Sequence, residues 1–544
     1  MSSTTQIIVF SDLHISRFSG YFHEEAFTNG IMSIAHQMRE NPDTILINLG
    51  DITDQGTIED YNYANALIKG TFATHGVEQP TIHYIPGNHD FRNIGMEIWQ
   101  DLYGSRHFFI DTTKKGGKVV ILGIDSVEPD ANSGRIGSRG RDEIFARLSS
   151  YPDEIIKILT FHHHLLPIPY TGRERSMIRD AGDVLPILWQ AGVDIVIVGH
   201  RHFPNSFSIS NGERKMLLIN NGTFSSHKTR GKAGHVYLSL EISADELRVA
   251  FHGIDRYSIF QEPTTYIHSL DKGLISSYSV AQPSQTLVAK VCQITCFHFT
   301  KKSEFQRDIF NKGIQMILEE KPSLIVSCGG LTNDSYEEDY NLAKNFLDML
   351  KEKNQPIVLV PGTRDLQPFG RTLWMKQVGP LNPIYDDSKN NIHVFGVNTG
   401  PEPNGIIGRS NLKSLRNEFE KFKDKRIFIT LMHHSCMPVP QTAFERTIKD
   451  AGDALEFFTH HKIPLILSGL GHSAGALQVE ESVFVNAGTF SSRKIRSKKR
   501  NTYNVLSLYN NQVLVVEEVE IHSSKRHHLG SYRVPIPMFD DSNI

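Results

Sequence analysis

The sequence predicts an α/β protein that contains one folding unit twice. Short runs rich in β-branched residues alternate with longer stretches of helical periodicity, which is the pattern of strands joined by helices. Several phrases occur twice at a nearly constant spacing, and a polar residue follows almost every apolar run. Together these observations favour buried sheets covered by helices, with functional groups at the strand ends.

The first half of the chain shows the alternation clearly. The predicted strands are Gln6–Phe10, Thr44–Asn48, Thr81–Ile85, Lys118–Gly123, Ile155–Thr160 and Asp194–Val198. The amphipathic stretches Glu24–Arg39, Asp60–Lys69 and Asp180–Gln190 predict helices between them. The longest apolar runs are of strand length, far below the roughly 18 residues of a membrane span, so we expect no membrane association.

The second half repeats the first. Three phrases recur, namely Phe161–Pro169 as Met432–Pro440, Arg179–Asp183 as Lys449–Asp453, and Asn221–Ser226 within Asn486–Ser492. The spacing falls smoothly from 284 residues, between Ser11 and Thr295, to 270 residues, between Gly199 and Gly469. Loop deletions in one copy produce such a slow decrease, so we predict two copies of about 260 residues.

The repeat predicts the domain boundaries. We expect a first domain over 1–256 and a second over 288–524. The segment 257–287 carries Pro and Gly without clear periodicity, and it is the predicted linker. The tail 525–544 is polar and interrupted by Pro, so we expect it to be partly frayed.

Composition excludes several classes of protein. The chain has 544 residues, of which 39% are hydrophobic and 22% charged, which argues against a disordered or fibrous protein. A formal charge of −3 argues against wholesale binding of polyanions. Four cysteines are too few for a disulfide framework, and the N-terminus shows no secretory signal, so we expect a cytoplasmic protein.

Potential metal ligands follow five of the predicted strands. They are Asp12 with His14, Asp51, the run Asn88-His89-Asp90, His162–His164, and His200 with His202. In open α/β sheets, sites form just beyond the carboxyl ends of the strands. Aspartate, asparagine and imidazole together suit a divalent metal such as Mn, Fe or Zn.

This ordered series resembles the calcineurin-like metallophosphoesterases. The openings Ser11–His14, Gly50–Asp54 and Pro86–Asp90 are most similar to the class III cyclic-nucleotide phosphodiesterase-like branch. The resemblance implies two tandem domains, each a four-layer α/β/β/α sandwich, of which the first is catalytic. It also implies two divalent metal ions, with manganese the best candidate in vitro.

The resemblance implies a role for each candidate residue. Its metal ligands are Asp12, His14 and His202 for one ion, Asn88, His162 and His200 for the other, and Asp51 for both. His162 is preferred to His163 because it follows the strand directly. His89 resembles the non-ligand histidine that contacts phosphate or protonates the leaving oxygen, and Asp90 is expected to fix its tautomer.

The implied reaction is phosphoester hydrolysis by a metal-bridging hydroxide. The expected substrate is a small or cyclic-nucleotide-type phosphodiester, rather than a monoester. One alternative is a nuclease that uses the basic runs His227–Lys232 and Arg493–Arg500, which are candidates for nucleic-acid binding. An alternative of another class is a non-catalytic scaffold or regulator.

Arginines in two loops are further candidates for gripping a phosphate. They are Arg135, Arg139, Arg141, Arg173 and Arg175. Solvated surface arginines are the other interpretation of the same loops. The turn Asn221–Thr223 resembles a strand-end turn common in the family, and a purely structural turn is the other interpretation.

The second copy lacks much of this series. Cys296 replaces Asp12, Gly330 replaces Asp51, Thr363-Arg364 replaces Asn88-His89, and Leu470 replaces His200, while His298, His433 and His472 remain. We therefore predict an inactive second domain that acts as a scaffold or regulator, in an internal pseudo-dimer. All four cysteines (Cys292, Cys296, Cys328 and Cys436) lie in this copy. They either bind a zinc ion with the remaining histidines or fill space that lost ligands left.

Overall fold

The computed structural model describes residues 4–255, 258–260, 263–269, 286–440, 447–495 and 500–537. The chain divides into two compact units. Unit 1 comprises Met1–Ser208 with Arg214–Ser276, and unit 2 comprises Ile209–Glu213 with Ser277–Ile544. Both units mix helices and sheets, so the predicted α/β fold class is confirmed.

Unit 1 contains two mixed sheets. Its strands are β1 (Thr5–Phe10), β2 (Ile45–Asn48), β3 (Ile82–Tyr84), β4 (Phe108–Asp111), β5 (Val119–Gly123), β6 (Ile156–Thr160), β7 (Ile195–Val198), β8 (Asn205–Ser210), β9 (Lys215–Asn220), β10 (Val236–Ile242), β11 (Glu246–Gly253) and β12 (Thr264–Ser269). Its helices are α1 (Glu24–Glu40), α2 (Ile58–Thr74), α3 (Gly95–Tyr103), α4 (Gly137–Leu148) and α5 (Ala181–Ala191). One sheet has the order β12-β11-β10-β1-β2-β3, and within unit 1 the other has the order β8-β9-β7-β6-β5-β4.

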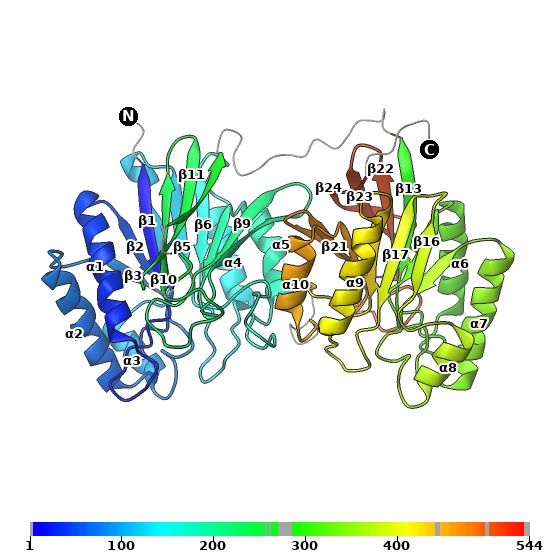
Figure 1. Ribbon diagram of the computed structural model, residues 1–544, viewed down its shortest axis with the longest axis horizontal. Helices are drawn as coiled ribbons and strands as arrows, with labels where there is room; N and C mark the ends of the chain where they lie inside the picture. The colour runs from blue at the N-terminus through cyan, green and yellow to red at the C-terminus, as the bar shows by residue number, and fades with distance from the viewer. Residues whose placement is uncertain are drawn as a thin grey trace. The chain divides into compact units, whose positions relative to one another are not determined.

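The central strand β1 explains how the layers of unit 1 form. It pairs in parallel with β2 and antiparallel with β10, and its last four residues are buried. Because side chains alternate along a strand, Ile8 and Phe10 face the helices, where they share one core with Phe27 of α1 and Ile68 of α2. Figure 1 shows α1 and α2 beside the first sheet, and α4 and α5 beside the second.

Unit 2 has the same order of elements. Its strands are β13 (Leu287–Ile294), β14 (Leu324–Ser327), β15 (Ile357–Leu359), β16 (Ile384–Asp387), β17 (Ile392–Val397), β18 (Ile427–Met432), β19 (Leu465–Ser468), β20 (Gly475–Val479), β21 (Ser482–Asn486), β22 (Thr502–Tyr509), β23 (Val513–Glu520) and β24 (Arg526–Arg533). Its helices are α6 (Arg307–Glu319), α7 (Glu337–Glu352), α8 (Gly370–Gln377), α9 (Gly408–Phe422) and α10 (Ala451–His460). The sheet orders, β15-β14-β13-β22-β23-β24 and β16-β17-β18-β19-β21-β20, match those of unit 1 strand for strand.

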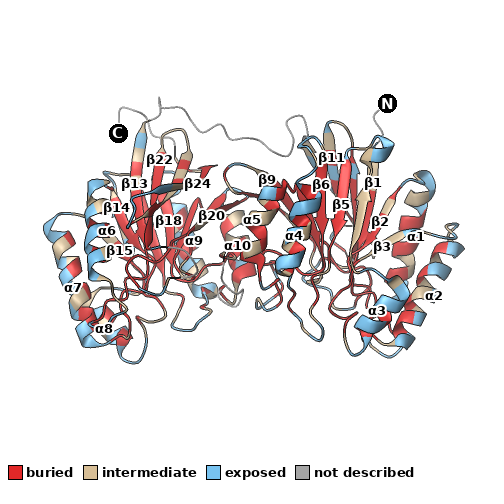
Figure 2. Cartoon of the chain, turned by 180° about the vertical axis from the view of Figure 1, so that it is seen from behind, coloured by how far each residue is buried: buried red, intermediate tan, exposed pale blue. Residues whose placement is uncertain are grey.

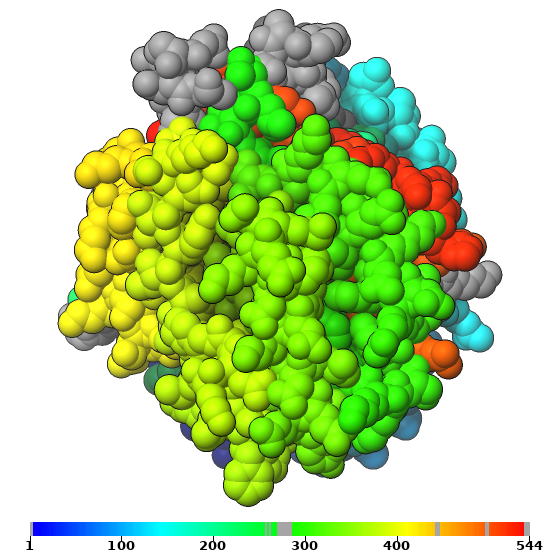
Figure 3. Space-filling view, turned by 90° about the vertical axis from the view of Figure 1, so that its right-hand side faces the viewer, coloured from blue at the N-terminus to red at the C-terminus, as the bar shows by residue number. Residues whose placement is uncertain are grey.

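Alternation along β13 shows where the two cores of unit 2 lie. Val291 belongs to a core with Val394 and Leu465 of the second sheet, so this core lies between the sheets. Ile294 belongs to a core with Phe310 of α6 and Phe346 of α7, which lies between the first sheet and its helices. The strands are accordingly buried on both faces, whereas the helices expose their outer faces (Figure 2). Figure 3 views unit 2 from the side of α7 and α8, whose surface is yellow-green.

Two predicted irregular segments contain strands. β12 lies inside the predicted linker 257–287 and pairs antiparallel with β11. β24 lies inside the predicted tail 525–544 and pairs antiparallel with β23. Both extend a sheet by an edge strand, which needs little hydrophobic periodicity of its own. The remainder of the linker, 270–285, lies outside the described residues. Among the described helices, none combines the length and apolar character of a membrane span.

Two helical glycines offer a matched test of this packing. A Cβ on Gly30 of α1 would lie 2.4 Å from the ring of Phe224, which is buried, whereas a Cβ on Gly70 of α2 would meet open space. We predict that Gly30→Ala lowers the free energy of unfolding by about 1–3 kcal/mol through overpacking. Gly70→Ala should raise it by up to about 1 kcal/mol through helix propensity. Denaturant unfolding measures both, and equal effects would contradict the predicted packing.

Candidate metal centre

The candidate ligands of unit 1 occupy loops that directly follow strands. Asp12 and His14 follow β1, Asp51 follows β2, and His200 and His202 follow β7. All five have a positive φ, with values of 57°, 52°, 52°, 74° and 56°. Residues other than glycine rarely adopt this conformation, and such strain concentrates at functional sites.

The loops bring three donors into a first group. Asp12, His14 and His202 are buried, and their ligand atoms lie within 4.8 Å of one another. His14 Nε2 is 3.2 Å from His202 Nε2, and Asp12 Oδ1 is 3.3 Å from His202 Nε2. Asp12 Oδ1 is buried and accepts no hydrogen bond from the described residues.

The protonation pattern of this first group suits a cation. His202 Nδ1 donates to the carbonyl of Lys228 at 2.8 Å, and His14 Nδ1 donates to Asp54 Oδ1 at 3.2 Å. In neutral rings, these outward bonds leave both Nε2 atoms with lone pairs that face each other. Burial lowers the pKa of His14 to about 4, with a second contribution from the charge of nearby His89, so the His14 ring is neutral at pH 7. Two facing lone pairs beside an unpartnered carboxylate oxygen fit a divalent metal ion.

A second group lies beside the first. It contains Asp51, His162 and His200, whose ligand atoms also lie within 4.8 Å of one another. His162 Nε2 is 3.2 Å from His200 Nδ1 and 3.3 Å from Asn88 Oδ1. His162 Nδ1 donates to the carbonyl of Leu49 at 2.7 Å, which turns Nε2 toward the group. The structure thus gathers all seven residues that the sequence predicts as ligands.

Asp51 lies between the two groups. Its Oδ2 atom is 3.6 Å from His14 Nε2 and 3.4 Å from His162 Nε2, while Oδ1 accepts the backbone N–H of His89 at 2.8 Å. Burial raises the pKa of Asp51, but His162 and His89 outweigh burial and hold this pKa well below its ordinary range. The carboxylate is therefore charged and reaches both groups.

His163 belongs to the surroundings of the site. Its Nδ1 atom lies 2.9 Å from the hydroxyl of Ser126, whereas the ring of His162 occupies the second group. The preference for His162 over His163 agrees with this geometry.

The partner of His89 differs from the prediction. We expected Asp90 to fix the tautomer of this ring, but the carboxylate beside it belongs to Asp54, whose Oδ1 lies 3.1 Å from His89 Nδ1. His89 Nδ1 also lies 2.9 Å from the backbone carbonyl of Asp54. Arg92 donates to His89 Nε2 at 3.0 Å. Asp54 thus orients both His14 and His89.

Asp90 instead holds the backbone together. Its carboxylate accepts the N–H groups of Thr53 at 2.9 Å, Gly87 at 3.0 Å and Ile52 at 3.2 Å. These bonds join the loop that carries Asp51 to the loop that carries Asn88. The expectation for Asp90 is wrong, because its carboxylate accepts these backbone N–H groups and the carboxylate beside His89 belongs to Asp54.

Four cationic side chains line the cavity in front of the two groups. This cavity has a volume of about 230 Å³, and its cations are Arg175, Arg201, Lys228 and Arg230. Arg201 is fixed by bonds to Ser176 Oγ at 2.9 Å and to Thr171 Oγ1 at 2.6 Å. Cationic side chains around one cavity suit a phosphate group.

Sequence reasoning identified part of this cationic lining. Arg175 was a candidate and lines the cavity, whereas Arg141 binds Asp180 at 2.6 Å. Arg201 was missed, although its place between His200 and His202 in the G-H-R-H run was a usable signal. Of the basic run Arg493–Arg500, residues 496–499 lie outside the described residues.

Comparisons with known proteins agree with this geometry. The family model for calcineurin-like phosphoesterases matches residues 5–204. A probable glycerophosphodiester phosphodiesterase (GpdQ) of Arcobacter nitrofigilis is 25% identical over 123 residues, which span 21% of this chain and 43% of that protein, less than half its length.

Two solved structures are also similar. A purple acid phosphatase from yellow lupin (Lupinus luteus) seeds has 14% identity and a TM-score of 0.38, over 49% of this chain and 54% of that chain. GAP50, the anchor in the inner membrane complex of Plasmodium, has 15% identity and a TM-score of 0.35, over 49% of this chain and 88% of that chain. The family match covers β1 through β7 and every loop that carries a candidate ligand. Residues 5–204 therefore match the calcineurin-like phosphoesterase family, which the sequence motifs also indicate.

Proposed function

We propose that unit 1 is a phosphodiesterase that uses two divalent metal ions. Asp12, His14 and His202 hold one ion, Asn88, His162 and His200 hold the other, and Asp51 contacts both. The observation that carries the proposal is the position of Asp51 Oδ2, 3.6 Å from His14 and 3.4 Å from His162. We propose Mn, Fe or Zn as the metals, since imidazole and carboxylate suit all three.

Each part of the site has a distinct task in the proposed reaction. A pair of metal ions lowers the pKa of bound water and neutralises the charge of a phosphate. Arg175, Arg201 and Arg230 bind the phosphate oxygens from the cavity wall. His89, whose Nδ1 is held by Asp54, is the group proposed to exchange a proton with the leaving oxygen, once the phosphate takes over the contact of Arg92.

A small phosphodiester is the proposed substrate. The cavity of about 230 Å³ accommodates a compact group, and the similar Arcobacter protein is named a probable glycerophosphodiester phosphodiesterase. A cyclic nucleotide belongs to the same chemical class. A nuclease is the second candidate, because Lys228 and Arg230 of the basic run His227–Lys232 line the cavity, where a longer phosphate backbone could pass.

Unit 2 is proposed to be inactive toward phosphodiesters. Gly330 stands where unit 1 has Asp51, and Leu470 stands where it has His200. Arg364 replaces His89 and cannot release a proton near neutral pH. Unit 2 then serves as a scaffold or regulator, and the internal pseudo-dimer stays a prediction.

A substrate panel tests the proposed reaction. We predict that the metal-loaded chain hydrolyses bis(p-nitrophenyl) phosphate and cyclic nucleotides faster than p-nitrophenyl phosphate. Asp51→Asn should lose about 10³-fold in kcat/KM, since both ions lose a charged ligand. Asp194→Asn is the control, because this buried carboxylate lies at the opposite end of β7 and accepts a hydrogen bond from the Lys157 backbone at 2.9 Å. Turnover of polymeric nucleic acid alone would favour the nuclease, and no turnover with any metal would favour a scaffold.

Two further variants separate orientation from metal binding. We predict that His89→Ala and Asp54→Asn keep two metal ions in unit 1 but lower kcat, the latter by about 10- to 100-fold, as for other groups that orient a site. Unit 2 carries Asn333 at the position of Asp54, so the fold accepts the substitution. Metal analysis and steady-state kinetics on the same samples give the result. Metal loss in His89→Ala would show that His89 is itself a ligand.

A further inference from the structure

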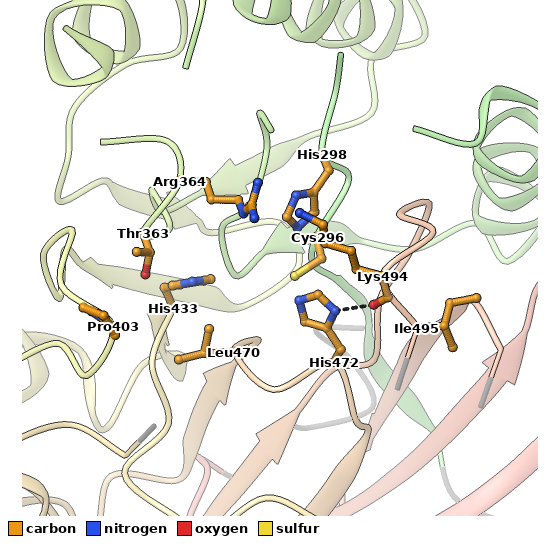
Figure 4. Close-up of a pocket in the computed structure, with 11 residues that line it drawn as sticks. Cys296, His298, Thr363, Arg364, Pro403, His433, Leu470, His472, Lys494 and Ile495 are labelled. Atoms are coloured by element: carbon orange, nitrogen blue, oxygen red, sulfur yellow. Dashed lines mark hydrogen bonds between the residues drawn. The ribbon is translucent and has the colours of Figure 1, made fainter. Parts of the chain in front are cut away.

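Three possible metal ligands meet in unit 2. Sγ of Cys296 and one imidazole nitrogen each of His298 and His472 lie within 4.8 Å of one another. Cys296 and His298 follow β13, and His472 follows β19. Figure 4 shows these side chains together at the wall of a cavity of about 400 Å³. The equivalent residues of unit 1 are Asp12, His14 and His202.

The backbone of unit 2 keeps the strained conformation at all three positions. Cys296, His298 and His472 have φ values of 57°, 55° and 58°, against 57°, 52° and 56° in unit 1. A left-handed conformation is sterically unfavourable for a residue with a Cβ. The position that corresponds to Asp51 is Gly330, for which the same conformation carries no such cost. Unit 2 therefore keeps the strained backbone at the three positions of the first ligand group, but not at the position of Asp51.

Hydrogen bonds orient both rings as in unit 1. His472 Nδ1 donates to the carbonyl of Lys494 at 2.6 Å, as the dashed line in Figure 4 shows. His298 Nδ1 donates to Asn333 Oδ1 at 3.3 Å. With Nδ1 engaged on the outer side, Nε2 of each ring is the nitrogen that would bind a metal ion.

The donor set selects one kind of metal. A thiolate with two imidazoles is a typical zinc ligand set, and three protein ligands leave the fourth tetrahedral position open. We propose that unit 2 binds one zinc ion through Cys296, His298 and His472. Of the second ligand group, unit 2 retains only His433, so it holds one ion where unit 1 holds two.

The cavity around this zinc site suits an anion. Arg364 and Lys494 line it, and its lining within the described residues contains no carboxylate. A zinc ion with a single thiolate adds a further positive charge. The fourth position therefore takes a small anion, whose charge faces Arg364 and Lys494.

Cobalt binding to the full-length chain tests the zinc site. All four cysteines lie in unit 2, so a sulfur-to-cobalt charge-transfer band in the near ultraviolet reports on unit 2 even when unit 1 also binds cobalt. We expect the metal-free chain to develop this band when it is titrated with Co²⁺, with a final intensity that corresponds to one sulfur-bound ion per chain. Added Zn²⁺ should displace this cobalt and abolish the band. Absence of the band in the wild-type chain would overturn the proposal.

Variants identify the sulfur ligand. Cys296→Ala should lose the band, whereas Cys292→Ala should keep it, because Cys292 is buried against the helices in the other core. Cys296→Asp introduces the residue that unit 1 has at this position, Asp12. This variant should still bind cobalt but without the band, which would show that the band is lost with the sulfur ligand and not through unfolding. A band that persists in Cys296→Ala would refute the ligand assignment.

The same cobalt-loaded samples test whether an anion binds at the fourth position of the metal, and a hydrolysis assay reports on unit 1 independently. Inorganic phosphate should shift the visible cobalt bands that belong to the sulfur-bound ion, and an unchanged spectrum would refute the anion at the fourth position. Phosphodiester hydrolysis should be equal in Cys296→Ala and the wild-type chain. The band does not depend on that activity, so failure of the proposed function and failure of the zinc site give different results.

Discussion

In both units, a buried aspartate receives backbone hydrogen bonds from the loops that follow the second and third strands. Asp90 does so in unit 1, and Asp365 accepts the N–H groups of Thr332 at 2.7 Å, Gly362 at 2.8 Å and Gly330 at 2.9 Å in unit 2. Burial, followed by the charge of Asp51, raises the pKa of Asp90 to about 6. The backbone N–H groups that bond this carboxylate favour its charged form and so offset part of the effect of burial on the pKa.

The ligand geometry of unit 1 depends on this interaction. Asp51 and Asn88 come from different loops, and the carboxylate of Asp90 fixes the distance between those loops. Unit 2 keeps the interaction although Gly330 and Thr363 stand at the two ligand positions, so the aspartate serves the scaffold and not the chemistry. The loops are thus held by protein atoms, in contrast to small metal domains that fold only around their ion.

Much of the fold, and the clustering of the candidate ligands, could be predicted from the sequence. Strand ends in a parallel sheet converge, so the series from Asp12 to His202 already implied one site. The contacts of Asp54 and Asp90 could not be predicted, because both follow strands and only the tertiary structure shows which carboxylate meets His89. β12 and β24 were missed because an edge strand is stabilised by its neighbour and carries a weak pattern of its own.

The glycine at position 330 has a consequence for how such a site is lost or kept. Asp51 holds a left-handed backbone at φ 52°, and Gly330 holds one at 72°. Glycine adopts this conformation without the clash of a Cβ, so an exchange of aspartate for glycine there relieves strain of about 1 kcal/mol. The backbone conformation therefore favours glycine at this position, whereas the hydrogen bond from the His89 backbone and the charges of His162 and His89 favour the aspartate. This position, which we propose to contact both ions, is therefore where purifying selection on each unit can be read most directly.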